Sequence, residues 1–275
     1  MSLFSAVEMA PRDPILGLNE QFAADTNPKK VNLGVGVYFD DKGKLPLLAC
    51  VQAAEKALMD KAASRGYLPI DGIAAYDSAV KVLVFGAESA AVQEGRIATV
   101  QALGGTGGLK IGADFLKKIN PEAQVLISDP SWENHRALFT NAGFKVQTYA
   151  YYDAGKRGVN FDGMLASLNA AAPGTIVVLH ACCHNPTGYD ITPAQWDQVI
   201  EVIKAKQLVA FLDMAYQGFG HGIAEDGAVI GKFVAAGLNF FVSSSFSKSF
   251  SLYGERVRAL SVVCGNKDEP ARVLS

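Results

Sequence analysis

Short apolar runs alternate with amphipathic stretches from about residue 95 to the end of the chain. The apolar runs lack strict alternation of apolar and polar positions, which indicates strands that are buried on both faces. The stretches between them, such as 109–119 and 193–203, repeat apolar residues at helical spacing. This pattern predicts an α/β fold in which helices cover both faces of a mainly parallel sheet. The predicted strands are 97–103, 124–128, 145–150, 175–180, 208–212, 240–244 and 257–263.

The first 45 or so residues follow a different pattern, because proline and glycine interrupt them repeatedly. Such residues favour turns, so we expect an arm and a loop there and no sheet units. The predicted organisation is an N-terminal arm with a small-domain segment at 1–45 and a large domain at 46–275. The helix-like run 268–275 reaches the last residue without a cap or stop signal. We therefore expect the large domain to be incomplete at its C-terminus and a C-terminal small domain to be missing.

Length, charge and cysteine content narrow the functional class. With 275 residues, 49% of them hydrophobic, the chain can bury a large core. Its 25 Lys and Arg residues against 27 Asp and Glu residues give a net charge of −2, which argues against a nucleic-acid or anionic-membrane surface. No apolar run reaches the roughly 18 residues of a membrane span, and the first residues lack the pattern of a secretory signal. Four cysteines make no disulfide framework, so we expect a cytoplasmic protein.

Lys248 ends an apolar run and stands among hydroxyl groups, in Val242-Ser-Ser-Ser-Phe-Ser-Lys-Ser-Phe250. A lysine at the end of a buried strand loses hydration, and burial lowers the pKa of its amine. Such an amine is suited to form a Schiff base with a carbonyl compound. Taken alone, an ordinary surface lysine is the commoner explanation, because lysine is rarely buried. The residues that follow the other predicted strands favour the Schiff-base interpretation over an ordinary surface lysine.

The segment Gly104-Gly-Thr-Gly-Gly108 follows the first predicted strand and precedes a helix. Glycines allow the backbone to approach an anion closely, and a helix N-terminus offers free N–H groups. Lys110 stands where the dinucleotide-binding pattern needs a third glycine, and the Gly-Lys-Ser/Thr of a P-loop is absent. We interpret the segment as a simple phosphate cradle, although a plain tight turn explains a glycine cluster equally well.

Polar side chains also follow the other predicted strands, and ligands of open α/β sheets bind beyond the carboxyl ends of the strands. Together these side chains supply an amine for an aldehyde, a carboxylate for a ring nitrogen, donors for a phenolic oxygen, and cations and hydroxyls for a phosphate. Those are the groups needed to hold pyridoxal phosphate. A tryptophan in this position is suited to stack on a planar ring, although a core tryptophan is commoner. The residues are Trp132, Asn185, Asp213, Tyr216, Lys248 and Arg256.

The cluster His180, Cys182, Cys183 and His184 invites a metal interpretation. On a strand, His180, Cys182 and His184 would share one face, with the outer two about 13 Å apart. One zinc ion, with ligand bonds of about 2.0–2.3 Å, can hardly use all three. We therefore expect no metal, and we expect the cysteines to be small packing residues.

A series of segments in chain order resembles the class I aminotransferases of the pyridoxal phosphate fold, in the aspartate and aromatic amino acid subgroup. The segments span the whole chain, and the sequence around Trp132 and Lys248 is most similar to the bacterial aromatic branch. The resemblance implies fold type I of the pyridoxal-phosphate-dependent transferases, with 46–275 as the cofactor-binding large domain. The segments are Asp13-Pro-Ile-Leu-Gly17, Asn32-Leu-Gly-Val-Gly-Val-Tyr38, Gly66-Tyr-Leu-Pro-Ile-Asp-Gly72, Gly104-Gly-Thr-Gly107, Ser131-Trp-Glu-Asn-His135, His184-Asn-Pro-Thr-Gly188, Asp213-Met-Ala-Tyr-Gln-Gly218, Ser245-Phe-Ser-Lys248 and Tyr253-Gly-Glu-Arg256.

The resemblance implies a role for individual residues. Lys248 would form the Schiff base and then move the substrate α-proton, Asp213 would pair with the ring nitrogen, and Tyr216 would donate to the phenolic oxygen. These three are the implied catalytic residues. His135 and His180 are similar to residues that support the aspartate in this family. The remaining implied cofactor contacts are Tyr67 from a neighbouring subunit, Gly105, Thr106, Trp132, Asn185, Ser245 and Arg256, and the implied substrate contacts are Gly36, Trp132 and Asn185.

The implied function is transfer of the amino group of an aromatic amino acid or aspartate to 2-oxoglutarate by a ping-pong mechanism, in a homodimer with shared active sites. Apolar Ile15 and Leu16 near the expected pocket mouth fit aromatic side chains. A noncatalytic regulatory module that binds pyridoxal phosphate, or an inactive truncated aminotransferase, is the alternative. The glycine spacing does not match that of a dinucleotide oxidoreductase, and such an enzyme would have no role for Lys248.

Two features depart from the family pattern. The arginines that grip the substrate carboxylates lie in a later segment of family members, and nothing in these residues replaces them. We therefore expect these 275 residues alone to lack normal transamination. In addition, Arg258 stands where the family usually has glycine. Two residues from Arg256, it is expected on the same strand face, where it would crowd or repel that phosphate-binding arginine.

Overall fold

The computed structural model describes residues 2–9, 16–32, 34 and 36–275. The chain divides into two compact units, Met1–Leu47 and Leu48–Ser275. The described part of the first unit holds the 3₁₀ helix η1 (Leu3–Ala6) and the helix α1 (Leu16–Ala24), and it contains no strand. The second unit carries the sheet.

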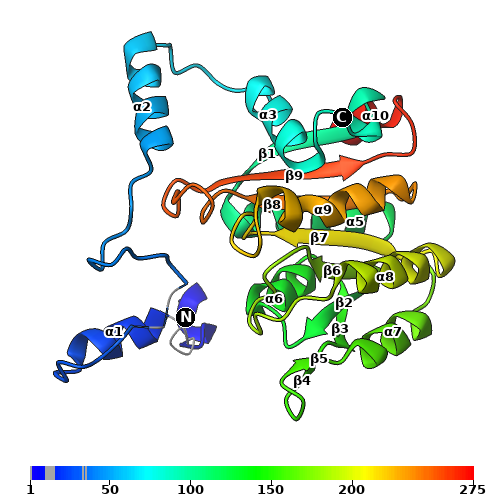
Figure 1. Cartoon of the computed structure of the whole chain (residues 1–275), viewed down its shortest axis with the longest axis horizontal. Helices are drawn as coiled ribbons and strands as arrows, with labels where there is room; N and C mark the ends of the chain where they lie inside the picture. Colours follow the sequence, from blue (N-terminus) through cyan, green and yellow to red (C-terminus); the bar gives the residue numbers. More distant parts are fainter. Residues whose placement is uncertain (1, 10–15, 33, 35) are drawn as a thin grey trace. The chain divides into compact units, whose positions relative to one another are not determined.

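The described residues of the second unit form a seven-stranded sheet of order β1-β9-β8-β7-β6-β2-β3 (Figure 1). The ladders from β8 through β3 are parallel, whereas β9 runs antiparallel to both of its neighbours. The predicted mainly parallel sheet is thus confirmed. The strands are β1 (Ile97–Leu103), β2 (Gln124–Asp129), β3 (Lys145–Ala150), β6 (Ile176–His180), β7 (Val209–Met214), β8 (Phe240–Ser245) and β9 (Val257–Val263), and a small hairpin adds β4 (Tyr152–Asp153) and β5 (Gly158–Val159).

The central strands are buried on both faces, as their unbroken apolar runs predict. Every residue of β8 is buried, and β6 and β7 are buried along all but one residue each. Two apolar clusters result, one on each face. The first includes Val177, Leu212 and Val242 and packs against the helices α3 (Ala74–Phe85), α7 (Phe161–Ala170), α8 (Pro193–Ala205) and α9 (Ile223–Ala235). The second includes Phe211, Phe241 and Leu260 and packs against α5 (Gly104–Ile119) and α6 (Glu133–Asn141).

Helices therefore cover both faces of the sheet (Figure 1). α8 begins at a capping box between Thr192 and Gln195 with proline in its first turn, which are local start signals. α5 begins at Gly104, five residues before the predicted helical stretch, so the glycine cluster is itself the first turn of the helix. The helices of this unit are α2 (Ala49–Lys61), α3 (Ala74–Phe85), α4 (Ala90–Gln93), α5 (Gly104–Ile119), α6 (Glu133–Asn141), α7 (Phe161–Ala170), α8 (Pro193–Ala205), α9 (Ile223–Ala235) and α10 (Glu269–Leu274).

Strand register brings the polar ends of several strands to one edge. His180 on β6 pairs with Asp213 on β7, and Asp213 pairs with Ser243 on β8. Because β9 is antiparallel, its first residues reach the same edge, where Arg258 pairs with Ser245. Residues that are far apart in sequence therefore meet at this edge.

Among the described residues, none of the helices combines the length and apolarity needed to span a membrane.

Candidate active site

Lys248 lies in the turn after β8 and is half-buried. Burial lowers the pKa of its amine below the usual 10.5, the Asp213 carboxylate opposes this shift, and Arg258 and Arg256 add to it. Its Nζ lies 4.9 Å from the centroid of the Tyr216 ring. The direction of the pKa shift agrees with the expectation from the sequence, and its main cause is the expected one.

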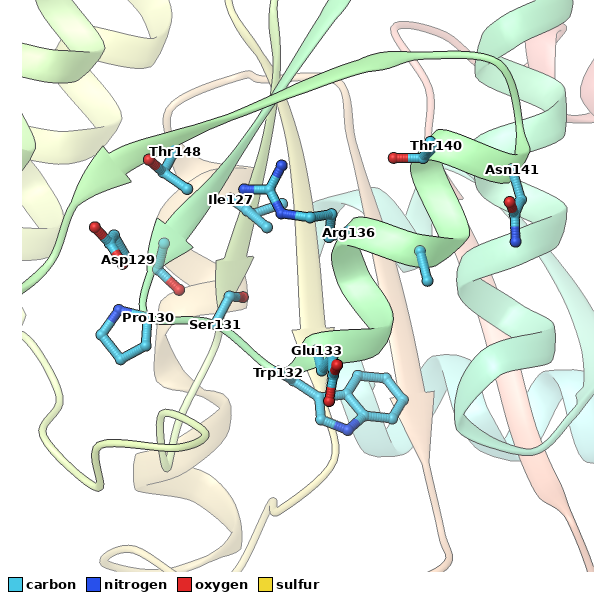
Figure 2. Close-up of a pocket in the computed structure, with 12 residues that line it drawn as sticks. Ile127, Asp129, Pro130, Ser131, Trp132, Glu133, Arg136, Thr140, Asn141 and Thr148 are labelled. Carbon is cyan, nitrogen blue, oxygen red and sulfur yellow. The ribbon is translucent and has the colours of Figure 1, made fainter. Parts of the chain in front are cut away.

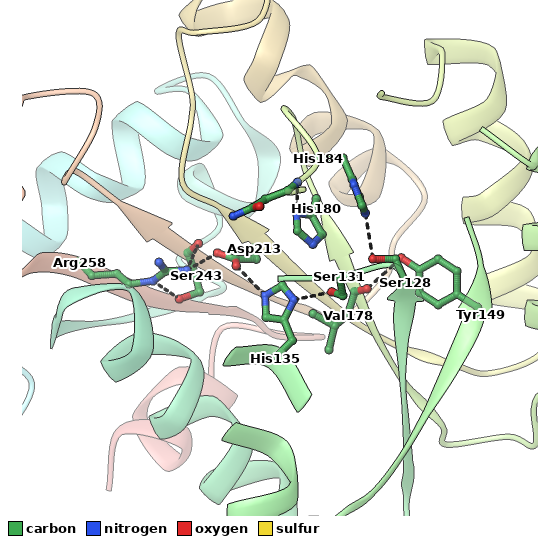
Figure 3. Close-up of polar contacts among 11 residues, drawn as sticks. Ser128, Ser131, His135, Tyr149, Val178, His180, His184, Asp213, Ser243 and Arg258 are labelled. Carbon is green, nitrogen blue, oxygen red and sulfur yellow. Dashed lines mark hydrogen bonds and ion pairs between the residues drawn. The ribbon is translucent and has the colours of Figure 1, made fainter. Parts of the chain in front are cut away.

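Asp213 is buried near the end of β7, and its carboxylate contacts the side chains of His135 and Arg258 (Figure 3). Its Oδ2 lies 2.8 Å from Nε2 of His135, and Nδ1 of that histidine lies 2.9 Å from Oγ of Ser131. Its Oδ1 accepts a hydrogen bond from Nη2 of Arg258. Burial alone would raise the pKa of this carboxyl, but the Arg258 guanidinium and the His135 hydrogen bond hold the pKa below the usual 3.8. Asp213 is therefore a carboxylate at neutral pH.

A row of three histidine rings extends from Asp213 along the sheet edge. The ring centroids of His135 and His180 are 5.0 Å apart, and those of His180 and His184 are 4.3 Å apart. Nδ1 of His180 accepts a hydrogen bond of 3.2 Å from the backbone N–H of Asn185, while its buried Nε2 has no protein partner. Burial lowers the pKa of His184 to about 4 and that of His180 well below 6.5. Both rings are therefore neutral near pH 7.

The first turn of α5 and Arg256 lie in contact where the sequence predicts a phosphate cradle, and this contact is called the cradle below. The backbone N–H of Gly104 donates to the carbonyl of Arg256 at 2.7 Å. Gly104 has a φ of +63°, which favours glycine, and a Cβ there would stand 2.0 Å from Nη2 of Arg256, so any larger residue would displace this guanidinium. Gly105 and Thr106 follow in the same turn, where the N–H groups of a helix N-terminus favour anions.

Two further predicted contacts, Asn185 and Tyr216, line one open pocket of about 590 Å³ beside Cys183 and His184. Ser245, also predicted to contact the phosphate, is the last residue of β8 and is buried, and its Oγ accepts from the backbone N–H of Ser247 at 3.3 Å. The cradle, Lys248 and this pocket all lie beyond the strand ends of the same sheet.

Trp132 precedes the first turn of α6 and lies beside the cradle, because a Cβ on Gly105 would come within 3.5 Å of its ring. Its ring meets that of His135 edge-on, with centroids 5.3 Å apart. Trp132 also lines a second open pocket of about 610 Å³, formed by residues of β2, β3 and α6 such as Asp129, Arg136 and Thr148 (Figure 2). Lys248 and Asp213 do not line this pocket, so the residues with the predicted chemistry lie at the strand ends and not in this pocket.

The remaining predicted residues are Tyr67, Gly36, Ile15 and Leu16. The side chain of Tyr67 is fully exposed. Gly36 belongs to the first unit, which is described separately from the sheet. Ile15 and the side chain of Leu16 lie outside the described residues.

The strand assumed in the metal interpretation ends at His180, so the expected common face of His180, Cys182 and His184 does not form. Both ring nitrogens of His184 already have partners, Ser128 at 2.9 Å and Thr187 at 2.8 Å. Within the described residues, the ligand atoms of Cys182, Cys183 and Asp226 lie within 4.8 Å of one another. The carboxylate of Asp226 already accepts backbone N–H groups of its own loop, which gives it a structural role.

The expectation that Arg258 shares a strand face with Arg256 is wrong. Arg256 precedes β9 in a turn with a φ of +59°, and its Nη1 donates to the carbonyl of Tyr253 at 2.9 Å. Arg258 lies in β9, is buried, and contacts Asp213 and Ser243 instead. Its partner Asp213 is 45 residues away in the sequence, and only the antiparallel placement of β9 brings the two together.

Comparison with known proteins agrees with this geometry. A profile of the family "Aminotransferase class I and II" matches residues 28–275. An aspartate aminotransferase of Pseudomonas aeruginosa is 66% identical over 275 residues, which are 100% of this chain and 69% of that protein. An aromatic-amino-acid aminotransferase of Escherichia coli is 49% identical over 273 residues, 99% of this chain and 69% of that protein.

Among solved structures, an aromatic-amino-acid aminotransferase from Burkholderia pseudomallei, covalently bound to pyridoxal phosphate, matches with a TM-score of 0.97 and 68% identity. The match covers 100% of this chain and 69% of that one. An aromatic amino acid aminotransferase from Burkholderia cenocepacia matches with a TM-score of 0.97 and 52% identity, over 99% of this chain and 69% of that one. The chain therefore belongs to the class I and II aminotransferase family.

Proposed function

We propose that this chain is a pyridoxal-phosphate-dependent aminotransferase that acts on aspartate or an aromatic amino acid with 2-oxoglutarate as acceptor. The observation that carries the proposal is the constellation at one sheet edge. There the half-buried Lys248 amine, with its lowered pKa, stands beside the buried carboxylate Asp213 and near the cradle.

The residues fit the aldehyde and phosphate ends of the cofactor. Lys248 offers an amine whose neutral form is favoured by burial, which is the form that attacks a carbonyl. The Gly104–Arg256 contact provides a guanidinium and helix N–H groups for the phosphate, with Gly105, Thr106 and Ser245 nearby in the same turn and strand end. When bound, pyridoxal phosphate supplies an electron-accepting ring that eases removal of the substrate α-proton.

Asp213, Tyr216 and Asn185 would hold the ring end of the cofactor, and burial and neighbouring charges shift the pKa values of the first two. Asp213 is the carboxylate for the ring nitrogen, although it is shared with Arg258. The pKa of Tyr216 is raised mainly by burial and further by the Asp213 carboxylate, so its hydroxyl stays protonated. This hydroxyl and the Asn185 side chain would donate hydrogen bonds to the phenolic oxygen of the cofactor. Trp132 would stack on the ring, and Lys248 would move the α-proton as base and then acid.

Substrates and assembly complete the proposal. The relatives are named for aspartate, tyrosine and aromatic amino acids, which is the basis for the substrate class proposed here. The fully exposed Tyr67 and Ile70 support a homodimer in which Tyr67 reaches the partner's cofactor, with Gly36 at the substrate. A cytoplasmic location remains part of the proposal.

A spectroscopic half-reaction tests this function. The chain is loaded with pyridoxal phosphate, and excess tyrosine or aspartate is added without a keto acid. We expect the absorbance of the aldehyde form to convert to that of the amine form, and 2-oxoglutarate to restore it. Both steps should be slower than normal transamination, because the arginines that grip the substrate carboxylates in the family are not among these residues. Lys248→Ala is the matched variant, and its rate of conversion should be lower by a factor of about 10²–10⁴, the usual contribution of a general acid–base group. Tight cofactor binding without any conversion would instead support a noncatalytic module.

A further inference from the structure

Arg258 and Asp213 form a buried ion pair beneath the first turn of α5 (Figure 3). Their side chains are only 1% and 7% exposed. Besides the bond to Asp213, the guanidinium donates through Nη2 to the carbonyl of Ser243 at 3.0 Å and through Nε to its hydroxyl. Three hydrogen bonds to two neighbouring strands fix the position of the guanidinium.

Helix α5 closes over this arginine. A Cβ on Gly108 would stand 3.2 Å from Cδ and Nε of Arg258, and a Cβ on Gly105 would stand 3.4 Å from its Nη1. Glycines at these positions allow the helix to lie directly on the guanidinium. Because the helix lies above and strands lie beside Arg258, its side chain is enclosed next to Asp213.

The Asp213 carboxylate is already neutralised by the protein. Its Oδ1 is bound by Arg258 and its Oδ2 by His135, and the single negative charge faces one permanent guanidinium. A ring nitrogen that also bonded Oδ1 would lie at most about 5.6 Å from Nη2, since each hydrogen bond spans about 2.8 Å. Like charges within about 4–6 Å disfavour the charged form, so the guanidinium opposes the stabilisation that the Asp213 carboxylate alone would give to a protonated ring nitrogen. The Arg256 guanidinium adds further positive charge close by.

We propose that Arg258 is the permanent positive partner of Asp213, so that pyridoxal phosphate bound to this chain keeps an unprotonated ring nitrogen. The inference rests on the proposed function and concerns the same site. An unprotonated ring attracts electrons less strongly, so the α-proton of the substrate leaves more slowly although the cofactor is attached. Arg258 acts through Asp213 and touches no reacting atom, which makes it a positioning residue.

The protonation state of the ring is read directly by nuclear magnetic resonance of cofactor labelled with ¹⁵N at the ring nitrogen. The unmodified 275-residue chain, loaded with this cofactor at pH 7.5, is expected to show the chemical shift of a neutral pyridine. A pyridinium shift in the unmodified chain would overturn the inference without any variant being needed.

Two variants separate charge from bulk. Arg258→Met removes the charge and keeps a long side chain, and it should give the pyridinium shift. Arg258→Lys keeps a cation and should retain the neutral shift. The Met variant should also bind pyridoxal phosphate about tenfold more tightly than an analogue with CH in place of the ring nitrogen, the effect of one pKa unit. The unmodified chain should bind the two within about threefold. Identical shifts in all three proteins would contradict the inference.

Failure of the inference is distinguishable from failure of the proposed function. Borohydride reduction fixes an attached cofactor on Lys248 whatever the state of the ring nitrogen. A fixed cofactor with a pyridinium shift overturns the role of Arg258 alone, whereas the absence of any fixed cofactor overturns the proposed function.

Discussion

The amine nitrogen of Lys248 lies 4.9 Å from the centroid of the Tyr216 ring. Lys248 follows β8 and Tyr216 follows β7, and these strands are parallel neighbours. The ring therefore covers one side of the amine, while the raised pKa of Tyr216, due first to burial, keeps its hydroxyl a hydrogen-bond donor. Lys248 supplies the amine and Tyr216 supplies a hydrogen-bond donor, so single substitutions can test the two roles separately.

Tyr216→Phe removes the hydroxyl and keeps the ring beside Lys248. We expect the dissociation constant of pyridoxal phosphate to rise about tenfold, which corresponds to the roughly 1–1.5 kcal/mol of one lost hydrogen bond. A fluorescence titration measures this value. Tyr152→Phe, on the small β4–β5 hairpin, is the matched control and should bind like the unmodified chain. Equal affinity of the Tyr216 variant and the control would contradict a donor role for this hydroxyl.

Gly104→Ala should weaken binding of the phosphate end specifically. The new Cβ would stand 2.0 Å from Nη2 of Arg256 and would force the guanidinium out of the cradle. We expect affinity for pyridoxal phosphate to fall by about tenfold or more, as for loss of one charge-assisted contact of about 1.5–3 kcal/mol. Affinity for pyridoxal, which has no phosphate, should stay unchanged. Gly107→Ala in the same turn meets only ordinary contacts at 3.5 Å and is the control.

Asp213→Asn should destabilise the cofactor-free chain in a pH-dependent way. The pKa of Asp213 is lowered from 3.8 in the folded state, so its ionised form stabilises the fold above pH 3.8 and this contribution is lost as the pH falls through the folded value. The variant leaves Arg258 buried without its partner, which costs about 3–5 kcal/mol. Urea unfolding at pH 7 and pH 3 should show a large difference that shrinks at the lower pH.

The surface pair of Asp197 and Lys232 provides the comparison for that experiment, because the aspartate is 59% exposed. Asp197→Asn should change the unfolding free energy little at either pH, since exposed ion pairs contribute little. An Asp213 variant that unfolds like the Asp197 variant would show that the buried pair does not form.

Gly112→Ala tests the packing of α5 on the sheet. A Cβ at this position would stand 2.5 Å from the Phe211 ring, so the helix or the ring must move. We expect a loss of about 1–3 kcal/mol in unfolding free energy, the usual cost of overpacking. Gly231→Ala in the exposed part of α9 meets nothing within 4 Å and should stabilise the chain by about 0.5–1 kcal/mol. Loss of stability in both variants would contradict the packing argument.

The strands of this fold are predictable because burial on both faces requires continuous apolar runs. The run 97–103 matches β1 at both ends, and 240–244 stops one residue short of the end of β8. The start of α5 is less predictable, because glycines are poor helix formers and here serve a close approach to Arg256 and Arg258. The helix α1 in the proline- and glycine-interrupted N-terminal part has no clear periodic signal.

Some residues of the candidate site are likewise predictable from the sequence, and others are not. Lys248 and Asp213 stand at strand ends, and the rule that ligands bind beyond carboxyl ends selects them from the sequence. The pairing of Arg258 with Asp213 depends on the antiparallel direction and exact neighbours of β9. An apolar run carries no information on strand direction, so the sequence placed Arg258 beside Arg256 instead.

Covalent attachment of the cofactor at one lysine tests the central claim most directly. The chain is incubated with pyridoxal phosphate, reduced with borohydride, digested and examined by peptide mass spectrometry, with Lys248→Ala treated in parallel. We expect one stoichiometric reduced adduct on Lys248 and none at that position in the variant. An unmodified Lys248 peptide, or equal labelling spread over exposed lysines in both proteins, would contradict it.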